Sequence, residues 1–532
     1  MYQSKKLARS FFVYRWLLAS VLSVVLALST TLTPANAVAK AGAKCFKAGS
    51  TEVVKGKSYT CIKSGKKLVW DKGVRTSISK SGSPSKAEVV FDFHKTYSTD
   101  NGYYDNFVGP QAQDPKLPSE WLEVQKSFEQ IRPALGPVRL AKYNLGNARP
   151  VTSFQPSKEF TQIDLCKISS SNNRSGLSHY PDSYRSQRKH PGPNSIIQLI
   201  PIYAEDTAKP INSPSQDYLK YLNLIKEWIN YSSDFGSNAQ IRIPTEYIKF
   251  PNKVEPYKLF HPVNWDTPGH VRFNQDVIST VDPVIDFSGV HIGIVVAPPG
   301  TEASIMQQAA LGSFKTSEGL VVSASSQFST LAANMRQASY AGLGEPFWWI
   351  HELYHVGYGL DDRYGDSKNN ISGEYGMGWW TLMTPFGGDL SVWEKWLIGF
   401  VQDSQIQCVS NPSSSTHWIA PASVNTQESK AVVVPISATK VVVAESIRPA
   451  GLHYKVAQQY QGVLVYEIDL TKTEHGMGMK LSLPTNRNVN NRSAFFLADA
   501  SLRKGDSTTS NGITFTILES GSFGDVIKIS KN

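Results

Sequence analysis

The pattern of apolar residues changes near Phe400, and this change divides the chain into regions of different fold class. Between residues 87 and 400, short apolar runs such as 196–202 and 290–297 alternate with stretches whose apolar residues recur at helical spacing. Beyond Phe400, β-type runs separated by turn residues predominate, at 431–436, 440–443, 463–468 and 513–518. We therefore predict an α/β or α+β domain over residues 87–400 and a C-terminal β-domain, resembling a sandwich, over residues 401–532.

The first residues have the three-part pattern of a secretory signal peptide. Four cations precede an apolar run from Trp16 to Leu28, which is followed by the small-x-small sequence Ala35-Asn36-Ala37. The apolar run is shorter than the roughly 20 residues that a membrane-spanning helix needs. We predict a signal peptide over residues 1–37, no transmembrane segment after its removal, and a protein that is secreted and extracellular or retained at the cell surface.

The formal net charge of +10 is concentrated near the N-terminus. Residues 38–80 contain eleven Lys or Arg against Glu52 and Asp71, whereas residues 81–532 carry a small net negative charge. We therefore predict no nucleic-acid binding by the chain as a whole. A small basic module at residues 38–75 suits an anionic cell-envelope polymer, although a solvated charged face would have the same composition.

Four cysteines, an even number in a chain that we expect to be exported, indicate disulfides. Cys45 and Cys61 would close a loop inside the basic module, whose aromatic residues are too few for an unaided core. Cys166 and Cys408 would then tie the start of the main domain to its far end, although the sequence leaves other pairings open. Residues 76–86, rich in Ser, Gly and Pro, are typical of a flexible linker.

A helix is predicted to begin at Pro346, because the fixed φ and missing N–H of proline suit the first turn. We expect this helix to run to about Val356 and to be ended by Gly357 and Gly359.

This predicted helix contains the sequence His351-Glu352-Leu353-Tyr354-His355. The two histidines lie one helical turn apart on the same face, so both imidazoles can bind one Zn²⁺ ion. Glu352 lies beside them and can take a proton from an attacking water and deliver it to a leaving amine. The pattern predicts a zinc-dependent hydrolase with Glu352 as the catalytic base, although two buried structural histidines would give the same spacing.

A catalytic zinc ion normally has three protein ligands, so a third must follow the two histidines. Strict counting of the extended zincin pattern gives Asp361, six residues after His355, but it places Tyr358 where a turn glycine is normal. If one residue is inserted, Gly359 becomes the turn glycine and Asp362 the ligand. We predict Asp362 and keep Asp361 as the alternative.

Two further residues bear on this site. Glu374 lies at the distance expected of a thermolysin-like third ligand, but its glycine-rich surroundings make a second ligand-bearing helix improbable. Met383, in the sequence Trp380-Thr381-Leu382-Met383, could form the methionine turn that lies beneath the metal of zincins with the extended motif. A core methionine is the alternative interpretation.

With these motifs, the chain resembles the immune inhibitor A family of secreted bacterial metallopeptidases. Three motifs carry the resemblance, and they read His351-Glu352-x-x-His355, Gly359-Leu360-Asp361-Asp362-Arg363-Tyr364 and Trp380-Thr381-Leu382-Met383. The resemblance covers about residues 195–530, with similar segments at 281–288, 444–448 and 462–466. The chain departs from the family pattern by one extra residue between His355 and the Gly-Leu pair.

This resemblance implies a zincin-like catalytic domain with endopeptidase activity on protein or peptide substrates. By the family alignment the metal ligands are His351, His355 and Asp362, with Glu352 as the base. Structural Ca²⁺ could accompany the zinc, although the sequence assigns no residue to it. A peptidase-like surface binding or adhesion protein that has lost activity is the alternative function, and the intact His351, Glu352 and His355 argue against it.

Overall fold

The computed structural model divides the chain into two compact units, Met1–Ala87 and Glu88–Asn532. The residues that the structure describes are 40–54, 57–75, 144–156, 162–169, 191–234, 236–259, 268–301, 305, 311–319, 321–326, 347–363, 365, 376–378, 380–384, 389–410, 413–453, 456, 458–472, 476–488 and 497–531. The predicted signal peptide at 1–37 and linker at 76–86 lie outside these ranges. No helix within them is long and apolar enough to cross a membrane.

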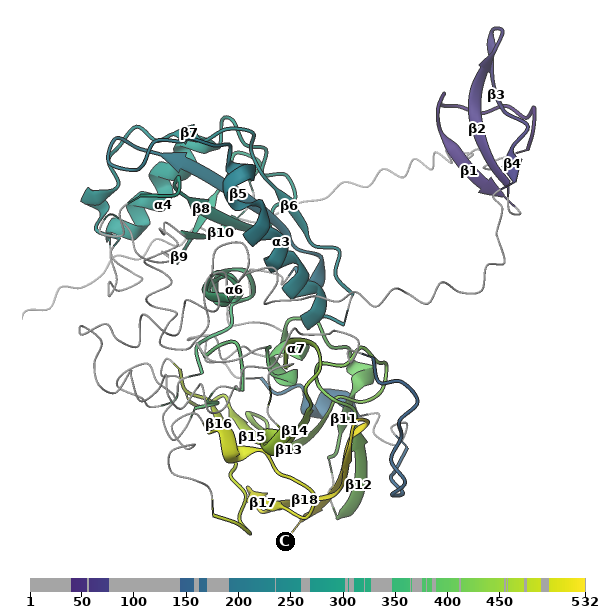
Figure 1. Cartoon of the computed structure of the whole chain (residues 1–532), viewed down its shortest axis with the longest axis vertical. Helices are drawn as coiled ribbons and strands as arrows, with labels where there is room; N and C mark the ends of the chain where they lie inside the picture. The colour runs from purple at the N-terminus through teal and green to yellow at the C-terminus, as the bar shows by residue number, and fades with distance from the viewer. Residues whose placement is uncertain are drawn as a thin grey trace, which may run out of the picture. The chain divides into compact units, whose positions relative to one another are not determined.

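The N-terminal unit is a small four-stranded antiparallel sheet (Figure 1). Its strands are β1 (Thr51–Val54), β2 (Lys57–Ser64), β3 (Lys67–Trp70) and β4 (Val74–Arg75). The buried core contains Trp70 and the Cys45–Cys61 disulfide, which confirms the first predicted pairing. Phe46 is not part of this core, since it is 77% exposed. The disulfide therefore supplies stability that so small an apolar core could not provide.

A mixed sheet forms the first half of the second unit. Strand β5 pairs with β6, β7 and β8, and β8 pairs with β10; all these pairs are parallel. Strand β9 pairs with β10 in the antiparallel direction. The strands are β5 (Ile196–Tyr203), β6 (Gln240–Arg242), β7 (Ile248–Lys249), β8 (Ile292–Val296), β9 (Leu311–Lys315) and β10 (Val321–Ser326). The two strands predicted at 196–202 and 290–297 are thus confirmed as β5 and β8.

Helices cover both faces of this sheet (Figure 1). Alternate residues of β5 point to opposite faces, so Leu199 packs with helix α3 (Pro214–Ser232) and Ile200 with helix α4 (Pro268–Val281). Helix α3 begins with a capping box, in which the Ser213 hydroxyl accepts from the N–H of Gln216.

The second half of this unit consists of two β-sheets. One sheet has the strand order β11-β13-β14-β15-β16 and the other β12-β19-β18-β17. The strands are β11 (Ile406–Cys408), β12 (Ser414–Ile419), β13 (Ala431–Ser437), β14 (Lys440–Ile447), β15 (Gly462–Asp469), β16 (Met479–Leu481), β17 (Ser507–Ser510), β18 (Ile513–Gly521) and β19 (Gly524–Lys531). Apolar side chains from both sheets share one buried core, in agreement with the β-domain predicted from the β-type runs after Phe400.

A single large core continues across residue 400. It contains Leu199 and Leu222 from the first half together with Val433 and Leu464 from the second. The predicted division at 400/401 therefore separates sheets that share a core within one compact unit. The Cys166–Cys408 disulfide, predicted from the cysteine count, lies in this unit, with Cα atoms 5.9 Å apart.

Candidate metal centre

The two histidines lie on one short helical segment. Helix α6 (Phe347–Leu353) carries His351 and Glu352 and continues as η6 (Tyr354–Tyr358), a turn of π-helix that carries His355. The prediction that Gly357 helps to end the helix is wrong, because this residue lies inside η6. A Cβ atom at Gly357 would lie 2.4 Å from Cδ1 of Ile292, so any larger residue here would force the Ile292 side chain of β8 to shift.

Gly359 ends the helical segment, as predicted. Its φ of 72° is in the left-handed region, which glycine adopts at little cost. The N–H of Gly359 donates to the carbonyl oxygen of His355 at 3.0 Å. The chain therefore reverses immediately after the second histidine and returns toward it.

Backbone carbonyl groups orient both imidazole rings. Nδ1 of His351 lies 2.7 Å from the carbonyl oxygen of Leu382, and Nδ1 of His355 lies 2.7 Å from that of Leu360. A carbonyl oxygen can only accept, so Nδ1 carries the proton in the neutral form of each ring and Nε2 presents its lone pair. Bonds of this kind fix the tautomer and orientation of histidines that bind metals.

Three ligand atoms converge where these lone pairs point. Nε2 of His351 and Nε2 of His355 are 3.0 Å apart, and Oδ1 of Asp362 lies 3.1 Å and 3.2 Å from them. Ligands at tetrahedral angles around zinc, each about 2.0–2.1 Å from the ion, would be about 3.3 Å apart. All three side chains are buried. The donor atoms, their spacing and their burial therefore fit one tetrahedral zinc ion.

Electrostatics at this position favours a positive charge. Burial alone would lower the pKa of His355, but the adjacent carboxylate of Asp362 raises it to about 9, with a smaller contribution from the charge of Glu352. The same negative potential that holds a proton would also attract a divalent cation.

The two candidate third ligands have different surroundings. Asp362 faces both histidines, whereas Oδ2 of Asp361 accepts a hydrogen bond from the N–H of Gly476 at 3.1 Å. Asp361 does not belong to the cluster of His351, His355 and Asp362. The geometry agrees with the alignment that inserts one residue before Gly359.

Met383 lies in a turn beside the histidines, at residues 381–384. Its side chain is fully buried, and its carbonyl oxygen accepts from the N–H of Arg363 at 2.9 Å. The preceding carbonyl, that of Leu382, is the one that orients His351. The segment proposed as a methionine turn is therefore directly connected to the candidate site.

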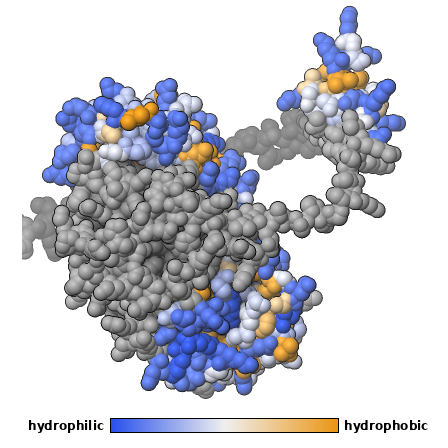
Figure 2. All heavy atoms as spheres, in the orientation of Figure 1, coloured by the Kyte–Doolittle hydropathy of each residue, from blue (hydrophilic) through white to orange (hydrophobic). Residues whose placement is uncertain are grey.

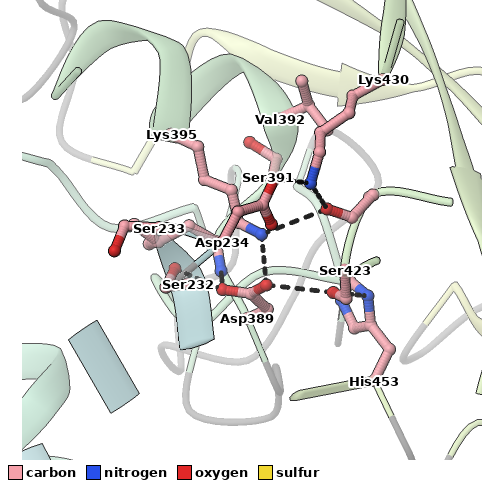
Figure 3. Close-up of polar contacts among 12 residues, drawn as sticks. Ser232, Ser233, Asp234, Asp389, Ser391, Val392, Lys395, Ser423, Lys430 and His453 are labelled. Carbon is pink, nitrogen blue, oxygen red and sulfur yellow. Dashed lines mark hydrogen bonds and ion pairs between the residues drawn. The ribbon is translucent and has the colours of Figure 1, made fainter. Parts of the chain in front are cut away.

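A buried polar network around Asp389, drawn in Figure 3, is connected to this turn through the backbone. The N–H of Leu382 donates to the carbonyl oxygen of Asp389 at 2.8 Å, and the Asp389 carboxylate is paired with the ammonium group of Lys395. Ser232 and Ser423 also donate to this carboxylate, at 2.6 Å and 3.0 Å. Burial alone would raise the pKa of Asp389, but Lys395 holds it below its ordinary value. An ionised buried carboxylate thus anchors the segment that orients His351.

The helix start predicted at Pro346 and the interpretations of Tyr364 and Glu374 fall outside the described residues. Within the described ranges, His351, His355 and Asp362 form the one group of three or more His, Cys, Asp or Glu side chains compact enough to hold a metal ion. No second group of such side chains that could hold structural Ca²⁺ is found in the same ranges. Sequence reasoning missed the carbonyl groups of Leu360 and Leu382, because backbone groups leave no signal in residue types.

No protein-family model matches the chain, and no curated protein matches it. The resemblance to the immune inhibitor A family therefore remains a prediction from the three motifs.

Proposed function

We propose that this chain is an exported zinc-dependent endopeptidase with a zincin-like catalytic region. The observation that carries the proposal is the convergence of Nε2 of His351, Nε2 of His355 and Oδ1 of Asp362, with Glu352 on the same helix. Two disulfides and the absence of a membrane-spanning helix from the described residues are compatible with a secreted protein.

The chain's own residues would act as follows. His351, His355 and Asp362 would hold Zn²⁺, which when bound supplies a Lewis acid that polarises a peptide carbonyl and lowers the pKa of water. Glu352 would accept a proton from the attacking water and pass it to the departing amine. The carbonyls of Leu382 and Leu360 would keep both imidazoles oriented during turnover.

Removal of the metal tests the proposal. Purified protein is expected to contain about one zinc ion per chain and to hydrolyse casein or gelatin, because the cluster brings three ligand atoms within reach of one ion. A chelator should abolish hydrolysis, and added zinc should restore it. Zinc-loaded protein without chelator-sensitive hydrolysis would instead support the inactive binding protein, and protein without zinc would contradict both.

We also propose that the basic module at residues 38–75 binds an anionic cell-envelope polymer. Seven of its lysines are exposed, namely Lys40, Lys44, Lys47, Lys63, Lys66, Lys67 and Lys72. Hydrophilic residues cover most of this unit's visible surface (Figure 2). Exposed charges of one sign attract a polyanion, and salt screens the attraction within about 8 Å at physiological ionic strength.

Charge neutralisation tests this binding without removing the fold of the module. Changing the seven lysines to glutamine should release the protein from cells at physiological salt, while leaving the Cys45–Cys61 disulfide and casein hydrolysis intact. Wild-type protein should be released only as salt is raised. Equal retention of both proteins at every salt concentration would rule out the polyanion.

A further inference from the structure

A buried carboxylate at the start of helix α7 (Val392–Leu397) is bound more extensively than a helix cap requires. Glu394 is fully buried and forms a capping box with Ser391, whose N–H and hydroxyl donate to Oε2 at 2.9 Å. Two donors from other segments also reach it. The Thr381 hydroxyl donates to Oε2 at 2.6 Å, and Nε of Arg363 donates to Oε1 at 3.1 Å.

Both of these donors are adjacent in sequence to groups of the metal centre. Arg363 follows Asp362 directly, and its Nη1 also donates to the carbonyl oxygen of Asp362 at 3.2 Å. Thr381 directly precedes Leu382, whose carbonyl orients His351. One carboxylate therefore links the segment that presents the third ligand to the segment that orients the first.

The backbone joins the same two segments. The N–H of Arg363 donates to the carbonyl oxygen of Met383 at 2.9 Å. The N–H of Met377, four residues before Thr381, donates to the carbonyl oxygen of Arg363 at 3.0 Å. These bonds hold the segments side by side but do not set the approach of the Arg363 and Thr381 side chains. Glu394 sets that approach, because both side chains must meet its two oxygens.

We propose that Glu394 is a positioning residue for the metal centre, holding Asp362 and the Leu382 carbonyl in the arrangement that binds zinc. This inference rests on the proposed zinc site. Glu394 does not touch the ligand atoms. It acts through Arg363, with which it forms an ion pair that is almost fully excluded from solvent, and through Thr381. Partners of this outer kind typically change metal affinity by about 10–100-fold when they are lost.

Substitution of glutamine for Glu394 distinguishes positioning by the carboxylate from packing by a side chain of the same size. Arg363 donates to one carboxylate oxygen, and Thr381 and Ser391 donate to the other. A glutamine amide has only one accepting oxygen, so its NH₂ group must face one of these two sets of donors. The guanidinium of Arg363 would also lose the negative charge of Glu394 within the protein interior. We expect the two segments to shift without any change in side-chain size.

The experiment measures zinc binding and stability in parallel. The Kd for zinc, obtained by competition with a chelator, is expected to rise about 10–100-fold in Glu394→Gln. The visible absorption spectrum of the Co²⁺-substituted protein should change as well, because it reports ligand geometry. Neither readout depends on peptide hydrolysis.

Asp525→Asn is the matched control. Asp525 is equally buried and accepts from Arg448, Ser446 and Ser520, so it has an arginine and hydroxyl partners as Glu394 has. It lies in β19 of the C-terminal sheet and bonds to neither metal-site segment. This variant should lose thermal stability but keep the wild-type Kd and Co²⁺ spectrum.

Thr381 supplies a second pair of variants in case Glu394→Gln does not fold. Thr381→Val removes the hydroxyl and should weaken zinc binding, whereas Thr381→Ser keeps it and should bind as the wild type does. Wild-type affinity in folded Glu394→Gln, or in Thr381→Val, would overturn the positioning role alone. A wild-type protein that binds no zinc would overturn the proposed metal function itself.

Discussion

Glu352→Ala is expected to keep its zinc and to lose peptide hydrolysis by about 10²–10⁴-fold, the usual contribution of a general base. Zinc should stay because the three converging atoms belong to His351, His355 and Asp362, and none of them comes from Glu352. The measurement is kcat/KM on a fluorogenic peptide, together with zinc content per chain.

Glu352→Gln is the control for this variant, because it preserves size while removing the ability to accept a proton from water. Both variants should be equally inactive and equally loaded with zinc. Turnover near the wild-type rate in either of them would remove Glu352 from the mechanism. Loss of zinc from both would show instead that this side chain helps to build the site.

Asp362→Ala is expected to lose zinc and with it all detectable hydrolysis, whereas Asp361→Ala should keep both. Oδ1 of Asp362 lies 3.1 Å and 3.2 Å from the two imidazole nitrogens, so its removal leaves a two-histidine site. The loss of affinity should exceed the roughly 10–100-fold that loss of an outer partner costs.

The neighbouring variant is a matched control for this prediction, since it makes the same chemical change one residue away. Asp361→Ala removes a hydrogen bond from the N–H of Gly476 and leaves that buried donor without its acceptor, at a cost of about 1–3 kcal/mol in stability. Zinc content and Tm of the two variants decide the matter. The reverse ranking of zinc content would show that Asp361 is the ligand.

Much of the fold follows from local patterns. The strands predicted at 196–202 and 290–297 are β5 and β8, and the β-rich texture after residue 400 becomes two sheets that share a core. These patterns are readable because a buried strand needs a run of apolar residues whatever surrounds it. The shared core across residue 400 was not predicted, since contacts between distant segments have no periodicity in the sequence.

The candidate site was likewise predictable from the sequence only in part. The capping box of Ser391 and Glu394 has a recognisable spacing, but nothing local shows that Arg363 and Thr381 reach the same carboxylate. The end of the helix also depended on packing, because Gly357 continues into η6 where it lies against Ile292.

The sequence by itself indicated the grouping of His351, Glu352 and His355, because residues three and four apart share a face of an α-helix. It also indicated two disulfides, from an even cysteine count in a chain whose N-terminal pattern predicts export. Only the tertiary structure decided which of Asp361 and Asp362 faces the histidines. That choice depends on the left-handed turn at Gly359, which the sequence offered as one of two alignments, and on the distant groups that hold each carboxylate, which residue spacing does not encode.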